Sequence, residues 1–257
     1  MAELPDSTKR FSDRVESYAR HRPGYPRAAL DVLAAEGLRD PDVVADVGSG
    51  TGILSELFLR RGHEVFGVEP NAPMRSAAEK LLAGYPRFRS VAGSAEATTL
   101  ESASADFAVA GQAFHWFDGD RAREEFLRIL RGEARVALLW NDRKTAGSAF
   151  SERYENLLRA FGTDYAAVDH KNLGGRAFDS FFGPAAWRLT SLPNEQRLDL
   201  AGLRGRLLSS SYAPAPGQPG HAAMMKELDE IFAATNEGGL VRMEYDTKVY
   251  FGRLRSG

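Results

Sequence analysis

Short apolar runs alternate with helically spaced apolar positions through the first half of the chain. The apolar runs predict strands over residues 43–47, 64–69, 88–91, 105–110 and 134–140. The segments between them predict helices over 51–61, from about residue 71, and over 120–130, because their apolar residues fall on one helical face. Strands that alternate with helices are typical of βαβ units, whose strands pair in parallel. We therefore expect an α/β fold built on a mostly parallel sheet.

The second half of the chain has a less regular pattern. It predicts helices over 150–161, 200–209 and 221–234 and a strand over 187–192. Residues Val241 to Leu254 alternate apolar and polar positions, which is typical of an exposed-edge strand or a hairpin strand. Residues 8–35 also have a helical pattern, broken by the prolines within residues 22–26. We expect about residues 36–145 to form the core, with residues 1–30 and 200–238 as a partly helical lid.

Composition narrows the classes of protein that this chain can be. Its 257 residues contain no cysteine, no repeat and no long linker, so we expect a single domain over residues 1–257. The lack of cysteine excludes disulfides, thiolate nucleophiles and cysteine-ligated metals, and it suits a reducing, cytoplasmic location. A net charge of −2 argues against broad nucleic-acid binding. The longest apolar run, Val136 to Trp140, is too short for a membrane span or a signal peptide. We therefore expect a monomer or homodimer with neither nucleic-acid nor membrane partners.

A glycine-rich turn, residues 46–52, lies between the first predicted strand and its helix. Free peptide N–H groups at such a turn favour a nucleotide-like ligand at the carboxyl ends of the strands. The dinucleotide fingerprint requires a third glycine where this chain has Ile53, and the lysine of a phosphate-binding loop is absent. Glu69 ends the second predicted strand, where a carboxylate can accept hydrogen bonds from both ribose hydroxyls. The turn therefore favours a nucleoside ligand over a dinucleotide.

Four motifs together resemble those of class I S-adenosylmethionine-dependent methyltransferases. They are DVGSGTG at residues 46–52, the acidic residue that closes the second strand, GSAEA after the third strand and AGQAFHWF after the fourth. The opening FSDRVESYARHRPGYP and the QAFHWF segment are similar to the type-11 group of small-molecule methyltransferases, which includes relatives of trans-aconitate methyltransferase. The resemblance covers residues 11–141. It implies a Rossmann-like three-layer sandwich with a seven-stranded, mostly parallel sheet whose last strand is antiparallel.

The resemblance also implies S-adenosylmethionine as cofactor, S-adenosylhomocysteine as product, and a role for each matching residue. Gly48 and Gly50 would pack on the methionine and ribose parts, Asp46 would hold the amino end, and Ser94 to Glu96 would bind adenine. The full implied cofactor set is Asp46, Gly48, Ser49, Gly50, Glu69, Pro70, Asn71, Met74, Ser94, Ala95, Glu96, Gln112 and Ala113. Purely structural alternatives remain: Asn71 as a helix N-cap, Met74 as core and Glu96 as a first-turn residue.

The aromatic segment after the fourth strand provides candidates for the acceptor side. Phe114 and Trp116 could face the acceptor, because aromatic faces stabilise a sulfonium cation and exclude water; ordinary packing is the alternative for Phe114 and Phe117. His115 is the candidate general base, although a carboxylate acceptor would need none. At the N-terminus, a cap could form in which an arginine clamps an anionic acceptor, unless this segment is a solvated helix. The residues of that cap are Tyr18, Arg20, Arg22 and Tyr25.

No metal site is expected. Asp118 and Asp120 precede a helix, and N-capping explains them more simply than metal binding does. We expect methyl transfer from S-adenosylmethionine to a small-molecule acceptor, with O-methylation of a carboxylate or hydroxyl favoured. The alternatives are a non-catalytic S-adenosylmethionine-binding protein and a nucleotide-dependent oxidoreductase.

Overall fold

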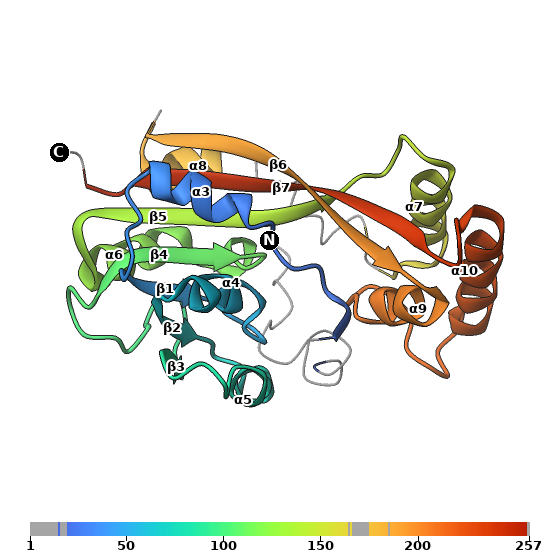
Figure 1. The fold of residues 1–257 in the computed structure, drawn as a ribbon, viewed down its shortest axis with the longest axis horizontal. Helices are drawn as coiled ribbons and strands as arrows, with labels where there is room; N and C mark the ends of the chain where they lie inside the picture. The colour runs from blue at the N-terminus through green and yellow to red at the C-terminus, as the bar shows by residue number, and fades with distance from the viewer. Residues whose placement is uncertain (1–14, 16–19, 164, 166–174, 185, 256–257) are drawn as a thin grey trace.

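The chain folds around one seven-stranded sheet with the strand order β3-β2-β1-β4-β5-β7-β6 (Figure 1). The structure is a computed structural model that describes residues 15, 20–163, 165, 175–184 and 186–255. In chain order the elements are α3 (Ala28–Ala35), β1 (Val43–Val47), α4 (Ile53–Arg61), β2 (Glu64–Val68), α5 (Ala72–Leu81), β3 (Phe88–Val91), β4 (Ala105–Gly111), η2 (Phe114–Trp116), α6 (Gly119–Ile129), β5 (Leu130–Arg143), α7 (Ala149–Phe161), α8 (Gly175–Phe182), β6 (Trp187–Leu198), α9 (Leu200–Leu208), α10 (His221–Thr235) and β7 (Val241–Arg253).

The direction of the strands confirms the expected sheet. β1 pairs in parallel with β2 and β4, β2 with β3, and β4 with β5. β7 is antiparallel to both of its neighbours, β5 and β6. The chain order reverses between β1 and β4, and open α/β sheets bind ligands at the carboxyl ends of the strands beside such a point. The fold therefore directs attention to the ends of β1 and β4.

The prediction for residues 241–254 needs one correction. The hairpin alternative is confirmed, because Val241 of β7 pairs with Leu198 at the end of β6. The exposed-edge alternative is wrong, because β7 is paired on both sides and β6 forms the edge of the sheet. The alternation of apolar and polar residues reports which face of a strand is buried, and it does not report whether the strand's edges are paired.

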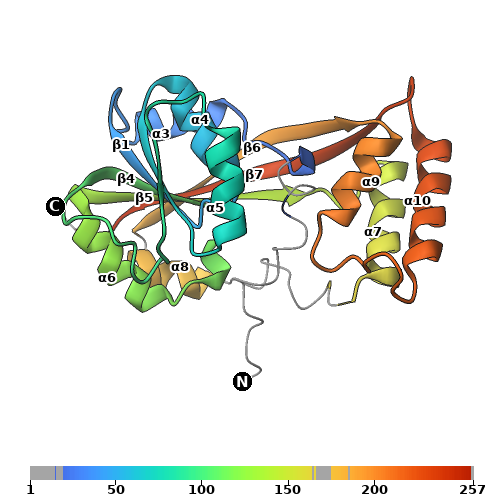
Figure 2. The ribbon, with the colours of Figure 1, turned by 90° about the horizontal axis from the view of Figure 1, so that it is seen from below.

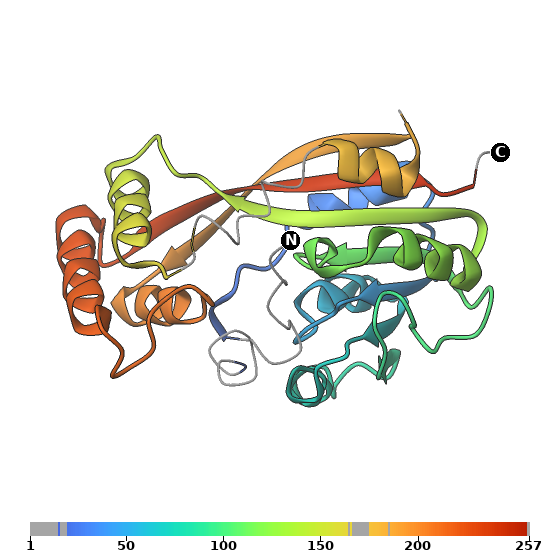
Figure 3. The same ribbon diagram turned by 180° about the vertical axis from the view of Figure 1, so that it is seen from behind.

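Helices cover both faces of the sheet. α3 and α4 lie on the face turned towards the viewer in Figure 1, where Leu33 and Phe58 pack on Val44 and Val109. α6 and α8 cover the opposite face, which Figure 3 shows from the front. All these contacts are between fully or nearly fully buried apolar side chains. The three-layer arrangement follows from strands whose successive side chains point to opposite faces and are apolar on both.

β5, β6 and β7 are long, and their far ends carry a separate group of helices. β5 and β6 extend beyond the predicted 134–140 and 187–192. α7, α9 and α10 pack there against one another, away from the helices that flank β1–β4 (Figure 2). Their core contains Leu157, Leu203 and Leu228, all with 0% exposure. We call α7, α9 and α10 the distal helical cluster; it includes the residues predicted as a lid over 200–238.

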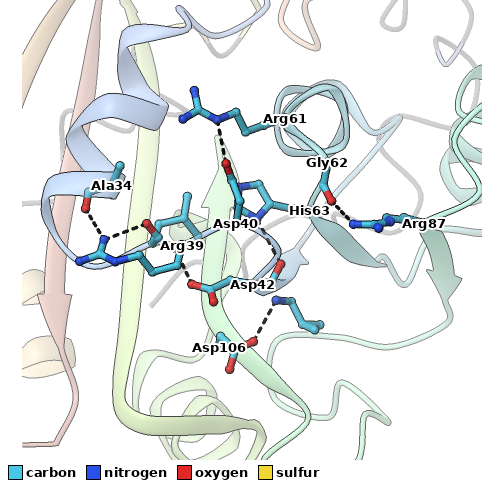
Figure 4. Close-up of polar contacts among 11 residues, drawn as sticks. Ala34, Arg39, Asp40, Asp42, Arg61, Gly62, His63, Arg87 and Asp106 are labelled. Carbon is cyan, nitrogen blue, oxygen red and sulfur yellow. Dashed lines mark hydrogen bonds and ion pairs between the residues drawn. The ribbon is translucent and has the colours of Figure 1, made fainter.

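Polar contacts join the amino ends of β1 and β2, on the side of the sheet opposite to the carboxyl ends of these strands (Figure 4). The His63 ring is 1% exposed; its Nε2 lies 3.2 Å from Oδ1 of Asp40. Its Nδ1 lies 3.2 Å from the carbonyl oxygen of Asp42. The amide of Val43 donates to Asp106, which begins the neighbouring part of β4. These contacts fix the start of the central strands.

The remaining elements agree with most of the expected ones. The helix before β1 is confirmed as α3; the earlier part of the predicted 8–35 helix lies largely outside the described residues. Two elements, η2 and α8, have no counterpart in the predicted pattern. No helix in the described ranges has the length and apolar character needed to cross a bilayer.

Candidate functional site

The glycine turn connects β1 to α4 and shapes the centre of the site. Gly48 has a φ of 71°, and a Cβ added there would lie 2.6 Å from the Cβ of Ala113. Gly50 has a φ of 56°, and a Cβ there would meet no atom within 4 Å. Both conformations are unfavourable for residues with a side chain. The turn therefore packs tightly on the segment after β4 at Gly48 and opens towards empty space at Gly50.

Glu69 follows β2, and its carboxylate is hydrogen-bonded both to the glycine turn and to the residue that caps α5. Its side chain is 9% exposed. One carboxylate oxygen accepts the amide of Gly50 at 2.9 Å, and the other accepts the amide of Asn71 at 2.9 Å. Burial raises the pKa of Glu69, while these amides and the charge of Arg75 act in the opposite direction. The carboxylate is thus held at the carboxyl end of β2 beside the glycine turn.

Asp46 is a fully buried carboxyl group within β1. Its Oδ2 accepts a hydrogen bond of 2.6 Å from the hydroxyl of Ser55. Its Oδ1 is buried and has no hydrogen-bond partner among the described residues. Burial raises the pKa of Asp46 to about 7, the Ser55 hydrogen bond opposes this, and the charge of Glu69 adds to it. Oδ1 is therefore placed to accept a hydrogen bond from a cationic donor, which would also stabilise the ionised form.

A cavity of about 250 Å³ lies at the carboxyl ends of the parallel strands; we call it the main cavity. It is lined by the glycine turn, the end of β2 with the start of α5, the loop after β3 and the segment after β4. The residues of its wall are Gly48, Gly50, Glu69, Pro70, Asn71, Met74, Ser94, Ala95, Glu96, Gly111, Gln112, Ala113, Trp116 and Phe117. The main cavity therefore brings together every predicted cofactor residue except Asp46 and Ser49.

A smaller cavity of about 50 Å³ adjoins the main cavity and contains the remaining two residues; we call it the small cavity. Its wall shares the glycine turn, Gly111 and Gln112 with the main cavity. It also includes side chains that lie far apart in the sequence, Arg22, Tyr25, Asn141 and Arg206. The two cavities together run from the loop after β3, past the glycine turn, to the N-terminal segment and α9.

Several cavity residues also have a structural role. The side chain of Asn71 accepts the amide of Met74 at 3.0 Å and caps α5, so the N-cap alternative holds while both residues also line the main cavity. Oε1 of Glu96 accepts the amide of Asp118 at 2.9 Å, just before α6. Gln112 has a positive φ of 58°, a conformation that concentrates at functional sites when residues other than glycine adopt it.

The aromatic segment after β4 divides between the core and the cavity. Trp116 and Phe117 line the main cavity. Phe114 is 4% exposed, and its ring centroid lies 4.9 Å from that of Phe181 in α8, so it is a core residue and the packing alternative applies to it. His115 lies beside Trp116, with 4.7 Å between their ring centroids, and it is not part of the wall described for either cavity. The predicted base is therefore not directed at the described cavities.

The predicted N-terminal cap is only partly present in the site. Arg22 and Tyr25 line the small cavity, and Arg22 donates to the carbonyl oxygen of Ser209, at the end of α9, at 3.0 Å. Arg20 is exposed and is not part of the wall of either cavity. Tyr18 lies outside the described residues. The arginine that faces the small cavity from this segment is therefore Arg22.

Arg206 and Asn141 are site residues that the sequence analysis missed. Arg206 is 6% exposed; its guanidinium donates to the hydroxyls of Tyr245 at 3.3 Å and Ser210 at 3.1 Å. Burial alone lowers the pKa of Arg206, but the surrounding phenols outweigh this effect, and the group stays protonated. One signal was present in the sequence: Arg206 lies on the same face of α9 as the buried Leu203 and Leu207.

No three histidine or acidic side chains in the described ranges come together in a way that could hold a metal ion. The N-cap prediction is confirmed for Asp118, whose side chain accepts a hydrogen bond from the amide of Arg121. It is wrong for Asp120, which lies in the first turn of α6.

The comparisons with known proteins agree with the geometry of the main cavity. Residues 45–138 match the family described as "Methyltransferase domain", a range that contains every residue of the main-cavity wall. An uncharacterized methyltransferase of Mycobacterium tuberculosis is 37% identical over 138 residues, or 54% of each chain. Another from Schizosaccharomyces pombe is 32% identical over 145 residues, covering 56% of this chain and 55% of the relative. The chain thus spans about half the length of the curated relatives it matches.

Solved structures share the fold. A "Putative Type II Methyltransferase" from Anaeromyxobacter dehalogenans superposes with a TM-score of 0.68 at 24% identity, covering 92% of this chain and 99% of the other. A "putative s-adenosyl-l-methionine-dependent methyltransferase" from Methanococcus maripaludis superposes with a TM-score of 0.52 at 19% identity, covering 75% and 91%. Both likenesses concern the arrangement of the sheet and its helices.

The residues present fit S-adenosylmethionine. Glu69 offers a carboxylate at the end of β2, and the opening at Gly50 leaves room for a ligand. The expected free N–H groups are not found at Gly48, Ser49, Gly50 and Gly52, because their amides donate within the chain, to Val68, Glu69 and Ser49. The buried, unpartnered Oδ1 of Asp46 offers an acceptor to an ammonium group, and Met74 and Trp116 give the main cavity apolar walls. Residues 45–138 therefore match a methyltransferase domain, and the main cavity that they line offers the groups that S-adenosylmethionine would require.

Proposed function

We propose that this protein transfers a methyl group from S-adenosylmethionine to a small-molecule acceptor, at an oxygen of a carboxylate or hydroxyl. The observation that supports this proposal most directly is the pair of adjoining cavities. The wall of the main cavity consists of the methyltransferase motifs, and the small cavity adds Arg22, Tyr25, Asn141 and Arg206, all outside residues 45–138. A cofactor cavity that continues into a differently lined space is what a two-substrate reaction requires.

The residues of the main cavity, together with Asp46 of the small cavity, would hold the cofactor along its length. Glu69 would accept the ribose hydroxyls, while the loop at Ser94 to Glu96 would contact adenine. Asp46 would accept from the ammonium of the methionine part. When bound, the cofactor supplies a methyl group made electrophilic by its sulfonium. Trp116 and Phe117 would stabilise the cationic charge and exclude water, and their positions in the wall support these roles.

A carboxylate acceptor suits the surroundings better than a hydroxyl does. A carboxylate is ionised at neutral pH and needs no general base, whereas a hydroxyl would need one. His115 is not part of the wall described for either cavity, so the predicted base is poorly placed to act. Two arginine residues, Arg22 and Arg206, line the small cavity. The rate would then come from orientation of the two substrates in a dry site.

Binding and turnover experiments test this function and its two alternatives. Isothermal titration should show binding of S-adenosylmethionine and S-adenosylhomocysteine but not of NAD; binding of NAD alone would point to the oxidoreductase. A panel of carboxylic acids, phenols and amines should then be screened for release of S-adenosylhomocysteine, with Glu69→Ala as the control for cofactor-dependent turnover. Release with a carboxylic acid is expected. Cofactor affinity without turnover on any acceptor would support the non-catalytic alternative.

A further inference from the structure

Arg206 is a buried charge that forms no ion pair with any of the described residues. Its side chain is 6% exposed, and the partners of its guanidinium, Tyr245 and Ser210, are neutral hydroxyls. No carboxylate in the described part of the chain forms an ion pair with it. Burying an arginine is costly unless its charge is compensated, so buried charges are normally paired. Among the residues that the structure describes, Arg206 therefore has no anion of the kind that usually accompanies such a group.

The small cavity lies where that anion would bind. Arg206 lines it from α9, and Arg22 lines it from the segment before α3. The bond from Arg22 to the carbonyl oxygen of Ser209 holds the Arg22 side chain against the end of the helix that carries Arg206. With a volume of about 50 Å³, the cavity has room for a group of only a few atoms. Two arginine residues thus line a space of the size of a small anionic group.

The same cavity contains a second unsatisfied group of opposite charge. Oδ1 of Asp46 is buried there without a partner among the described residues. An unpaired acceptor and an unpaired cation in one cavity are complementary to a ligand that has an ammonium and a carboxylate close together. A carboxylate from a second ligand would satisfy the arginines equally well. Either ligand would offset the unfavourable burial of Arg206.

We propose that Arg206, with Arg22 beside it, is a carboxylate-binding residue of the small cavity. The proposal rests on the proposed function, and it assigns a role to a residue outside the methyltransferase motifs. The planar fork of a guanidinium binds a carboxylate through two parallel hydrogen bonds. Two sources can supply this group: the methionine part of the cofactor and a carboxylic acid acceptor. A merely structural Arg206 would instead only brace Tyr245 and Ser210.

Binding measurements with two nucleosides distinguish the first source. S-adenosylhomocysteine carries the amino-acid part, and 5′-methylthioadenosine lacks it. If Arg206 binds the cofactor's carboxylate, Arg206→Met should weaken S-adenosylhomocysteine at least tenfold in isothermal titration while its affinity for 5′-methylthioadenosine stays unchanged. Arg206→Lys keeps the charge but loses the planar guanidinium. Its affinity for S-adenosylhomocysteine should lie between those of the wild type and Arg206→Met, and it replaces Arg206→Met in the test if that variant does not fold. Arg204→Met is the matched control, because Arg204 lies on the same helix and pairs with Asp229 at the surface.

Thermal shifts test the second source. Wild-type protein saturated with S-adenosylhomocysteine is screened against mono-, di- and tricarboxylic acids. If Arg206 binds the acceptor, an acid that raises the melting temperature of the wild type and of Arg204→Met should raise that of Arg206→Met much less. The proposal is overturned if S-adenosylhomocysteine binds Arg206→Met within threefold of wild type and no acid separates the two proteins. A wild type that binds neither nucleoside would defeat the proposed function itself, whereas selective binding without turnover would leave the role of Arg206 intact.

Discussion

At the scale of single residues, the site combines groups that are satisfied within the chain and groups that are not. Both oxygens of Glu69 accept backbone amides, and Asn71 caps a helix. Asp46 retains an unpartnered buried oxygen. A group of the second kind raises the free energy of the ligand-free protein and is stabilised when a ligand arrives. Removing such an unpartnered group should therefore weaken ligand binding, and it should raise the stability of the ligand-free protein.

Glu69→Ala should weaken binding of S-adenosylhomocysteine at least tenfold, about 1.4 kcal/mol, because the acceptor for the ribose hydroxyls is lost. Isothermal titration measures the change. Glu64→Ala is the control: Glu64 begins the same strand at its other end and lies 3.9 Å from Arg89 in a partly exposed pair. An unchanged affinity in Glu69→Ala would refute the ribose assignment.

Asp46→Asn should stabilise the ligand-free protein at alkaline pH. The raised pKa of Asp46, about 7, means that the folded state holds this proton more tightly than the unfolded chain does. Stability of the wild type is therefore lost as pH rises from about 4 to about 7, and the variant is spared this loss. From pH 5 to pH 8, the free energy of unfolding of the variant should rise by about 2 kcal/mol relative to that of the wild type.

Urea unfolding at the two pH values measures the difference, with the exposed Asp120→Asn as control. Saturating S-adenosylhomocysteine should reduce the gain, because its ammonium would stabilise ionised Asp46. Equal gains at both pH values would contradict the shifted pKa.

At the scale of elements, the sequence predicted what depends on local pattern and missed what depends on tertiary contacts. The bounds of β1, α4 and β2 and the start of α5 were predicted within two residues, because apolar periodicity and the glycine turn mark them. The ends of β5 and β6 were missed because their extensions are polar on one side and are stabilised by pairing with β7. α8 was missed because its eight residues give a short signal.

Packing explains why α8 nevertheless matters for the sheet. The ring of Phe178 stacks on Tyr250 of β7 with 4.2 Å between centroids, and it also stacks on Phe114 at 6.0 Å. Phe114 therefore packs on two rings of α8, those of Phe178 and Phe181, which accounts for its absence from the cavity wall. An aromatic residue just after a strand offers no sequence signal to tell a core ring from a cavity ring.

Phe178→Ala should lower the free energy of unfolding by about 3 kcal/mol, because it leaves a cavity among buried rings. Urea denaturation gives the value, with Leu189→Ala on the exposed side of β6 as the control expected to change little. Affinity for S-adenosylhomocysteine should be unaffected at temperatures where the variant is folded. A loss of less than 1 kcal/mol would show that α8 is not an integral part of the core.

At the scale of the whole molecule, the amino ends and the carboxyl ends of the parallel strands have different roles. The amino ends of β1 and β2 are joined by His63, Asp40 and Asp42, whereas the carboxyl ends form the main cavity. The cofactor side could be predicted from sequence because its residues follow one another in motifs. Arg206 and Asn141 could not, because only the long strands bring them to the glycine turn.

His63→Ala should therefore separate stability from binding. Loss of the two contacts of this buried ring should cost about 2 kcal/mol of unfolding free energy. The affinity for S-adenosylhomocysteine should stay within twofold of wild type, because the contacts of His63 lie at the amino ends of the strands and the main cavity lies at their carboxyl ends. Arg61→Ala is the control; its exposed pair with Asp40 should contribute less than about 1 kcal/mol. A large loss of affinity in folded His63→Ala would show that the two ends of the strands are coupled.

The distal helical cluster is attached to the sheet through neighbouring strands. α9 and α10 form the connection between β6 and β7, which pair with each other from Trp187 with Gly252 to Leu198 with Val241. A change in residues 199–240 therefore enters the molecule as an insertion in a hairpin, and it leaves the pairing of β1–β4 intact. The part of the small-cavity wall that Arg206 forms is therefore separate, in sequence and in strand pairing, from the glycine turn that it faces across the cavity. A change in the length or sequence of this connection would alter the small cavity and leave the wall of the main cavity as it is.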